Sequence, residues 1–255
     1  MDVIRSIVLA FSCFSTIPMP RLRWERDNMR YMMAAFPLVG LVVGACMFAW
    51  QHACAWLGVG ALLRGVVLAL IPLAVSGGIH MDGFADVVDA LASHAPAERK
   101  RQILKDPHTG AFAIMGICGY LLTSTALFYE SRPQDILALA CVPVASRCLS
   151  GFATVTFRPQ SAKGMYAAER GAAHVRVVQA VLVVTFACVA SCMVLWAGAA
   201  GAVAACASMV CVVAVRHVAH AQFGGMSGDL SGFMLQVAEL LMLACVVLVG
   251  RLVGT

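Results

Sequence analysis

Charged side chains are scarce in this sequence. Only 12% of its 255 residues are Asp, Glu, Lys or Arg, against about 25% in soluble domains. Apolar residues make up 61% of the chain, and the mean hydropathy is +0.87. One soluble globule cannot bury so much apolar surface. The composition therefore excludes an ordinary soluble domain and predicts a multi-span membrane protein.

Other absences narrow the class further. No dense basic run with interleaved aromatic residues is present, so the formal net charge of +5 does not indicate a nucleic-acid partner. None of the 11 cysteines forms a Cys-x-x-Cys pair, which leaves a zinc ribbon or a redox motif unsupported. Residues 1–19 lack a good small-residue cleavage site. We expect them to be retained as an interfacial or partly inserted helix.

About seven apolar stretches are long enough to cross a bilayer. They cover residues 31–57, 60–79, 110–129, 135–155, 177–197, 199–215 and 233–253. The sequence "WAGAAGA" predicts a tight turn between the fifth and sixth stretches. The expected fold class is therefore an all-α, polytopic helical membrane protein, with residues 1–255 forming one integral-membrane catalytic domain.

Basic residues concentrate in alternate loops. Loops 20–30, 80–109, 156–176 and 216–232 hold most of the Arg and Lys residues, whereas the intervening loops hold only Arg132. Lys and Arg are typical of cytoplasmic loops. We therefore expect these four loops to share the cytoplasmic side of the membrane.

An acidic segment, "HMDGFADVVDAL", follows the second stretch at residues 80–91. Spacings of four and three place Asp82, Asp86 and Asp89 on one face of a helix. Carboxylates this close repel one another unless a cation lies among them, and the ion they suit best is Mg²⁺, completed by waters and substrate phosphates. A solvated helix face or helix-capping acids is the alternative. His80, at the start of the segment, is a further candidate catalytic residue.

A second acidic segment, "GGMSGDLSGF", lies at residues 224–233. Its glycines, including Gly228, would let the backbone approach a ligand beside Asp229. A flexible loop with a helix cap at Ser227 or Asp229 explains the pattern equally well. Glu239, inside the last apolar stretch, is a candidate functional residue because an ionisable group there is costly.

Basic candidates complete the set. Lys105 and Asp106 precede a turn at Pro107 and Gly110, where Lys105 would contact phosphate or anchor the loop. Arg147, within an apolar stretch, needs either an acid from another helix or a substrate phosphate. Arg158, at the membrane surface, would bind phosphate or only set topology. Together these parts indicate Mg²⁺-dependent phosphoryl or nucleotidyl transfer to a large or amphiphilic substrate.

Three motifs carry a resemblance to a known family. "HMDGFADVVDAL", "LKDPHTGAF" and "GGMSGDLSG", in this order and at these separations, resemble the cobalamin (5′-phosphate) synthase family, also called adenosylcobinamide-GDP ribazoletransferase. The opening "FSTIPMP" is also similar, and the resemblance covers essentially the whole chain. Met81 stands where the family hallmark has Leu.

The resemblance implies a multi-pass enzyme of the bacterial inner membrane with its active site facing the cytoplasm. It would join adenosylcobinamide-GDP to α-ribazole or its 5′-phosphate, with release of GMP and a requirement for Mg²⁺. Asp82, Asp86 and Asp89 would ligate metal at the diphosphate, with His80 near the reacting groups. Other residues match family positions as well: Lys105, Asp106, Arg147, Gly228 and Asp229.

Several questions stay open at this point. The acceptor oxygen would belong to the 5′-phosphate or to a hydroxyl group, and His80 and Asp89 are candidate bases. The bilayer is one expected partner, and a homo-oligomer or a complex with other cobalamin-pathway enzymes is possible. A lipid-directed CDP-alcohol phosphotransferase is an alternative, but Asp82-Gly83 is not followed by the Ala-Arg pair expected there. An ion-coupled transporter is a second alternative, without the expected inverted repeat of broken helices.

Overall fold

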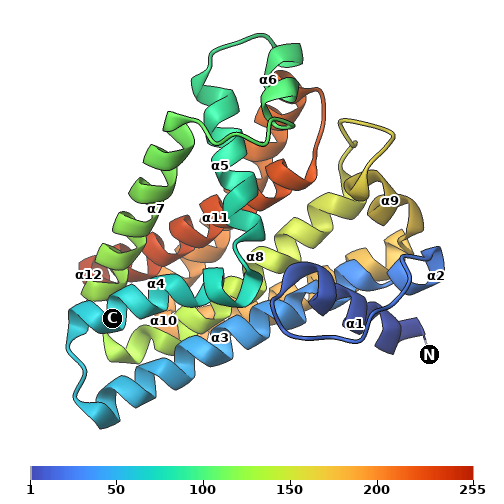
Figure 1. Ribbon diagram of the computed structural model, residues 1–255. Coiled ribbons are helices and arrows are strands. Elements are labelled where there is room, and N and C mark those ends of the chain that lie inside the picture. Colours follow the sequence, from blue (N-terminus) through green and yellow to red (C-terminus); the bar gives the residue numbers. More distant parts are fainter. Residues whose placement is uncertain (1, 255) are drawn as a thin grey trace.

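The computed structural model describes residues 2–254, and this part of the chain contains helices and no strand. The longer helices are α3 (Met32–Leu57), α4 (Ala61–Ser76), α5 (Ile79–Ala92), α7 (Ala111–Glu130), α8 (Ile136–Thr156), α10 (Val175–Val218) and α11 (Gly228–Ala244). The shorter ones are α1 (Asp2–Phe14), α2 (Arg26–Met29), α6 (Ala97–Ile103), η1 (Pro133–Asp135), α9 (Met165–Ala172), η2 (Ala219–Phe223), η3 (Cys245–Val249) and α12 (Gly250–Val253). Figure 1 shows their arrangement. The predicted all-α class is confirmed.

Five helical stretches are long and apolar enough to cross a membrane: Met32–Leu57, Ala111–Glu130, Pro133–Thr156, Val175–Phe223 and Gly228–Val253. α4 and α5 meet at a bend of 98° and together pass the same test as a broken sixth span. Gly77 and Gly78 form this bend with left-handed φ values of 65° and 80°, which glycine adopts without steric strain. The chain is therefore polytopic, as predicted.

The 44-residue α10 reverses direction at Gly198, where φ is 55° and ψ is −131°. A Cβ atom built on Gly201 would lie 2.1 Å from the carbonyl oxygen of Met193. Residues eight positions apart in a straight helix are separated by about 12 Å. α10 is thus a hairpin of two arms, residues 175–197 and 199–218. The prediction of about seven spans exceeds the five or six continuous ones because it divides α10 at this turn.

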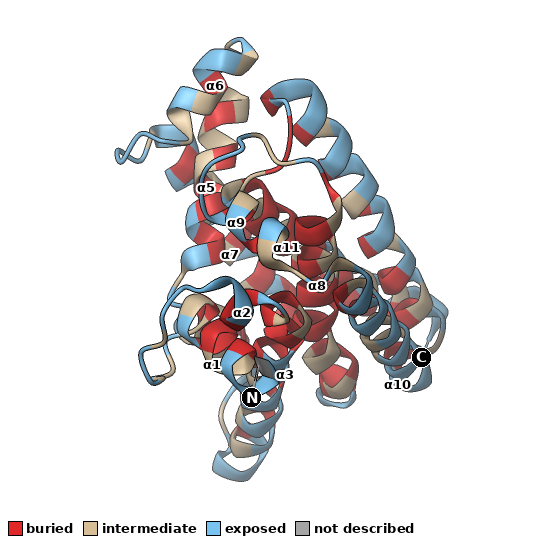
Figure 2. Cartoon of the chain, turned by 90° about the vertical axis from the view of Figure 1, so that its right-hand side faces the viewer, coloured by how far each residue is buried: buried red, intermediate tan, exposed pale blue. Residues whose placement is uncertain are grey.

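The core lies between α3, α8 and α11, whereas α10 and α7 keep much of their apolar surface exposed (Figure 2). Glycines bring α3 onto α8, since a Cβ atom at Gly44 would lie 2.2 Å from the carbonyl oxygen of Ala140. Large apolar side chains such as Leu122, Leu195 and Val210 point outward. Because a lipid tail is as apolar as these side chains, such an outer surface suits a bilayer.

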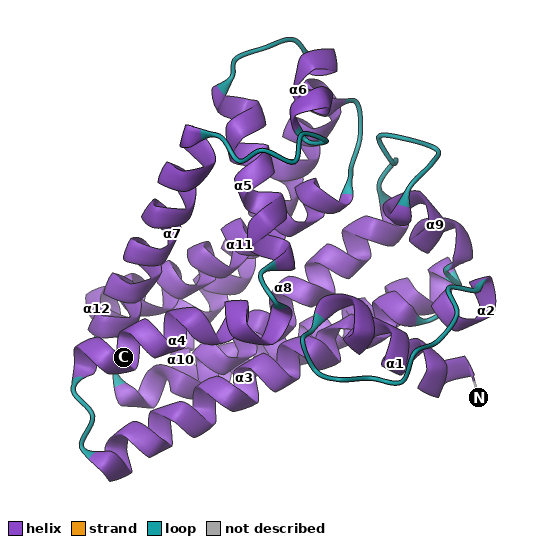
Figure 3. Ribbon diagram, viewed as in Figure 1, coloured by secondary structure: helices purple, strands orange, loops and turns teal. Residues whose placement is uncertain are grey.

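The four basic loops meet at one end of the bundle (Figure 3). They are joined by hydrogen bonds between Met226 and Arg158, Lys100 and Gln222, and His174 and Arg30. At the other end, Arg64 donates to the carbonyl oxygens of Phe128 and Ser131. The predicted alternation of loops therefore agrees with the fold. The membrane side that each end faces stays a prediction.

The N-terminal segment forms helix α1, as expected, and packs on α3. The Ser6 hydroxyl donates to the carbonyl oxygen of Asn28 at 2.8 Å, which ties α1 to α2. The Thr16 hydroxyl, just after α1, donates to the carbonyl oxygen of Ala74 at 3.0 Å. These contacts place the end of α1 beside the bend that leads into α5.

Candidate active site

The two acidic motifs lie side by side because α5 packs against the start of α11, backbone to backbone (Figure 1). A Cβ atom at Gly83 would lie 2.8 Å from the Cα atom of Asp229. One at Gly232 would lie 3.0 Å from the carbonyl oxygen of His80. The glycines in both motifs are therefore needed for helix packing. This packing sets the aspartates of the first motif against Asp229 of the second.

The aspartates of α5 and α11 form one cluster of negative charge. Asp86 interacts electrostatically with Asp82, Asp229 and Asp89. Among the residues that the structure describes, no three His, Cys, Asp or Glu side chains are arranged to hold a metal ion by themselves. Mg²⁺ does not need such a cage, because it commonly binds one or two carboxylates and completes its shell with waters and phosphate. The carboxylates present are therefore suitable ligands for Mg²⁺ in company with a substrate.

Asp89 has a structural role that the spacing did not reveal. Its Oδ2 atom accepts from the backbone N–H of Gly110 at 2.5 Å, and its Oδ1 atom accepts from that of Ala113 at 2.8 Å. These N–H groups lie at the start of α7. Backbone N–H groups in the first turn of a helix have no carbonyl acceptor within that helix. Asp89 thus caps α7 from another helix. Of the two sequence interpretations, a capping acid describes Asp89. A metal role for Asp82 and Asp86 stays a prediction.

A cavity of about 660 Å³ opens beside the cluster, bounded by α1, α3, α5, α8, α9 and the start of α11. Asp82 and Asp229 line it, as do the basic side chains of Arg101, Lys105 and Lys163. Gly228 at the first turn of α11 also lines the cavity, with open space where a side chain would be. Free N–H groups at a helix N-terminus attract phosphate. Acids, cations and these N–H groups together form a site for a phosphate ester and a cation.

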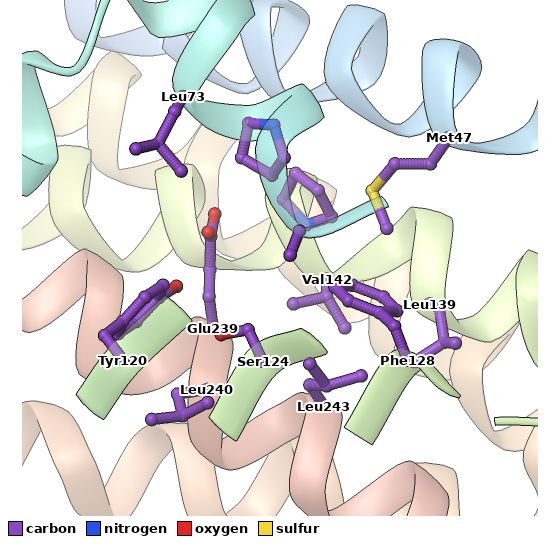
Figure 4. Close-up of a pocket in the computed structure, with 13 residues that line it drawn as sticks. Met47, Leu73, Tyr120, Ser124, Phe128, Leu139, Val142, Glu239, Leu240 and Leu243 are labelled. Carbon is purple, nitrogen blue, oxygen red and sulfur yellow. The ribbon is translucent and has the colours of Figure 1, made fainter. Parts of the chain in front are cut away.

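Arg147 and Glu239 form an ion pair inside the bundle. Arg147 is only 1% exposed, and Ser146 donates to the same Glu239 oxygen at 2.8 Å. Figure 4 shows the Glu239 carboxylate beside Leu73 and Tyr120 in a second, small pocket of about 30 Å³. Neither member of the pair lines the larger cavity. Of the two partners expected for Arg147, the structure provides the acid. A phosphate role for either residue stays a prediction.

Two more predicted residues lie outside the cavity. Asp106 hydrogen-bonds the exposed His108 at 2.8 Å, and this bond lowers the pKa of the Asp106 carboxyl. Arg158 has an exposed side chain, and its carbonyl oxygen accepts from the N–H of Met226. Of the three basic residues predicted from the sequence (Lys105, Arg147 and Arg158), only Lys105 lines the cavity.

Sequence reasoning missed an acidic residue of the cavity wall. Glu169 lies on α9, is 6% exposed, and lines the cavity. Burial raises the pKa of its carboxyl group to about 8. The segment "YAAERGAA" around it reads as a polar surface helix, because contacts with distant segments bury this acid. Ser150 and Thr154 also line the cavity. They were missed because the sequence does not show which neighbouring segments their hydroxyl groups meet.

Comparisons with known proteins agree on one family. The model of the cobalamin-5-phosphate synthase family matches residues 6–247. A Lachnoclostridium phytofermentans protein named adenosylcobinamide-GDP ribazoletransferase is 35% identical over 241 residues, covering 94% of this chain and 92% of the relative. Proteins of the same name from Clostridium botulinum (strain Eklund 17B) and Geobacillus thermodenitrificans are 32% and 28% identical. They cover 94% and 92% of this chain, and 95% and 92% of their own lengths. No solved structure matches this chain.

Proposed function

The chain belongs to the cobalamin-5-phosphate synthase family and is a transferase, and we propose that it joins adenosylcobinamide-GDP to α-ribazole or α-ribazole 5′-phosphate, with release of GMP. The observation that carries the proposal is the packing of α5 on the start of α11. It sets Asp82 and Asp229 beside the open N-terminal turn at Gly228, in a cavity with Lys105 on its wall. Nothing in this site favours the lipid-enzyme or transporter alternatives.

The reaction breaks one phosphoanhydride bond. An acceptor oxygen attacks the phosphorus attached to cobinamide, a new P–O bond forms, and the oxygen of GMP leaves. Because the product made from α-ribazole 5′-phosphate retains its 5′-phosphate, the attacking atom is a ribose hydroxyl oxygen. Its proton passes to a carboxylate of the aspartate cluster. Asp89 is not available for this step, because both of its carboxylate oxygens already accept backbone N–H groups.

We assign separate roles to the groups around the diphosphate. Asp82, Asp86 and Asp229 would hold Mg²⁺ in company with the substrate. A bound Mg²⁺ ion would neutralise the diphosphate and the departing GMP. Lys105 and the N–H groups at Gly228 contact phosphate oxygens directly. Asp89 fixes the start of α7 and with it the loop that carries Lys105.

The proposed site faces the cytoplasm from the bacterial inner membrane. All four basic loops meet at the end of the bundle where this cavity opens. Lys and Arg residues concentrate in cytoplasmic loops, and nucleotide substrates are made in the cytoplasm. The apolar outer faces of α7 and α10 would contact lipid.

The function is tested by reconstituting the purified protein in detergent with adenosylcobinamide-GDP, Mg²⁺ and either acceptor. We expect GMP and a corrinoid product in equal amounts, and only when donor and acceptor are both present. Asp82→Asn should abolish both products, whereas the exposed Asp27→Asn serves as a matched control and should not. GMP release without an acceptor, or no corrinoid product with either acceptor, would overturn the proposal.

A further inference from the structure

One end of the large cavity is not used by the phosphate chemistry. Its lining residues come from α1, α3, α5, α8 and α9, and Ser231 of α11 joins them. Three rings lie together there: the ring centroids of Phe14 and Phe36 are 4.3 Å apart, and those of Phe36 and His80 are 5.6 Å apart. All three side chains line the cavity. A flat aromatic ligand is favoured beside such a cluster, because aromatic rings associate face to face or edge to face.

His80 also has an unused polar atom at this end. Its Nε2 atom is buried and has no hydrogen-bond partner within residues 2–254. A buried polar atom without a partner destabilises the protein. The ring of His80 packs on that of Phe36, and His80 and Asp82 both line the cavity, so the aromatic cluster adjoins the acidic one.

A second wall of the same end is polar but uncharged. The hydroxyl groups of Ser150 and Thr154 on α8 lie 2.8 Å and 3.5 Å from that of Ser231 on α11. All three residues line the cavity. Such a row of hydroxyl groups suits the hydroxyls of a sugar, which both donate and accept hydrogen bonds.

Glu169 closes this end of the cavity. The Tyr166 hydroxyl donates to the carbonyl oxygen of Ala153 at 2.9 Å, which holds α9 against α8 and turns Glu169 inward. Its titratable neighbours are Cys13 on α1 and Tyr166 on α9. The Glu169 carboxyl has no ion-pair or hydrogen-bond partner in the described part of the chain. With its pKa raised to about 8 by burial, it carries a proton at neutral pH and acts as a hydrogen-bond donor.

We propose that this end of the cavity binds the aromatic base of the acceptor nucleoside, with Glu169 as the group that recognises the base's ring nitrogen. The base of α-ribazole is a benzimidazole, which is flat and mostly apolar and has one ring nitrogen that only accepts. The rings of Phe14, Phe36 and His80 match its faces, and the hydroxyl row matches its ribose. This inference rests on the proposed function. To that function it adds the location of the acceptor nucleoside within the cavity.

The test compares Glu169→Leu and Glu169→Gln with wild type, and uses exposed Glu25→Leu as the matched control. We expect Glu169→Leu to raise the KM for α-ribazole by about 10- to 100-fold, the effect of one lost buried hydrogen bond. The KM for adenosylcobinamide-GDP should stay within about twofold, since that substrate does not meet Glu169. Glu169→Gln keeps an N–H donor and should raise the acceptor KM by less than about 10-fold.

A second acceptor nucleoside tests whether the hydrogen bond from Glu169 is made to the ring nitrogen of the base. The α-riboside of the corresponding indole has C–H in place of the ring nitrogen. Wild type should bind it as weakly as Glu169→Leu binds α-ribazole, and Glu169→Leu should no longer distinguish the two ribosides. This comparison on wild type and Glu169→Gln also stands if Glu169→Leu fails to fold.

The outcomes separate the two proposals. If wild type transfers nothing to either natural acceptor, the proposed function fails and the inference fails with it. If wild type is active but binds the indole and benzimidazole ribosides equally, only the acceptor site is overturned. An equal rise in both KM values with Glu169→Leu would overturn the acceptor site too, because it would show a general disturbance of the cavity.

Discussion

Gly83 of α5 lies directly against the backbone of Asp229 in α11. A Cβ atom at Gly83 would be 2.8 Å from the Cα atom and 2.9 Å from the carbonyl oxygen of Asp229. The relationship is repeated three residues away, where Gly232 of α11 faces the backbone of His80. Two short motifs, separated by most of the chain, are thus one structural unit.

Replacing Gly83 with Ala tests this unit. The added methyl group would push α5 from α11, because the atoms it meets are backbone atoms that cannot rotate away. We expect a loss of about 1–3 kcal/mol in stability and at least about a tenfold fall in transfer rate. Both are measured on purified protein, by thermal unfolding and by GMP release.

Gly119→Ala is the matched control for that experiment. Gly119 is also helical, and a Cβ atom there meets nothing within 4 Å. We expect this change to leave activity intact and to raise stability slightly, since Ala is favoured over Gly by about 1 kcal/mol within a helix. Equal losses in Gly83→Ala and Gly119→Ala would contradict the role of the α5–α11 contact.

Asp89 is predicted to act through α7. Asp89→Ala should lower the free energy of unfolding by about 1–2 kcal/mol, as the loss of a helix cap does. The loss should be the same with and without Mg²⁺, because the partners of Asp89 are the N–H groups of Gly110 and Ala113. Thermal unfolding in EDTA and in Mg²⁺ measures this. A loss that appears only in Mg²⁺ would show that Asp89 is a metal ligand instead.

The Arg147–Glu239 pair is predicted to stabilise the bundle without taking part in the reaction. Glu239→Ala should destabilise the protein by about 3–5 kcal/mol, because it leaves a buried guanidinium uncompensated. The double variant Arg147→Met with Glu239→Leu should regain most of that stability, since it removes both charges. Its KM for the GDP-linked donor separates the two roles: an unchanged value supports a structural pair, and a large rise would show that Arg147 holds phosphate.

Stability should depend on pH through Glu169. The folded protein keeps the proton on this carboxyl group up to about pH 8, whereas an unfolded chain loses it near 4.5. The free energy of unfolding should therefore fall between these pH values, by up to about 1.4 kcal/mol per pH unit, and level off above pH 8. Glu169→Gln stays neutral, so its Tm relative to wild type should rise over the same window. Parallel Tm curves for the two proteins would contradict a buried, protonated Glu169.

Much of the architecture could be predicted from local patterns. The length of the apolar stretches predicted the membrane spans, and the alternation of basic loops predicted which loops share one end of the bundle. The sequence "WAGAAGA" predicted the turn that the structure has at Gly198. The spacing of Asp82, Asp86 and Asp89 correctly predicted one helix, α5. These features are encoded within single segments, so a sequence shows them directly.

The rest depends on which helices touch. Nothing near Asp89 shows that the start of α7 lies within reach of its carboxylate, and nothing near Arg147 selects Glu239 over a phosphate as partner. Glu169 stands in a basic loop next to Arg170 and looks solvated until α9 packs on α8. Contacts between distant segments decide each of these cases, and such contacts have no local periodicity.

The central claim is that the carboxylates at the junction of α5 and α11 support Mg²⁺-dependent transfer to the acceptor. The most direct measurement is the rate of GMP release across a Mg²⁺ titration, for wild type, Asp82→Asn and Asp86→Asn, with Asp27→Asn as control. We predict that wild type and the control are inactive without Mg²⁺ and saturate with it, and that both cluster variants lose at least about 100-fold in rate at every concentration. Near-normal turnover in both cluster variants, or full wild-type activity in EDTA, would contradict the account.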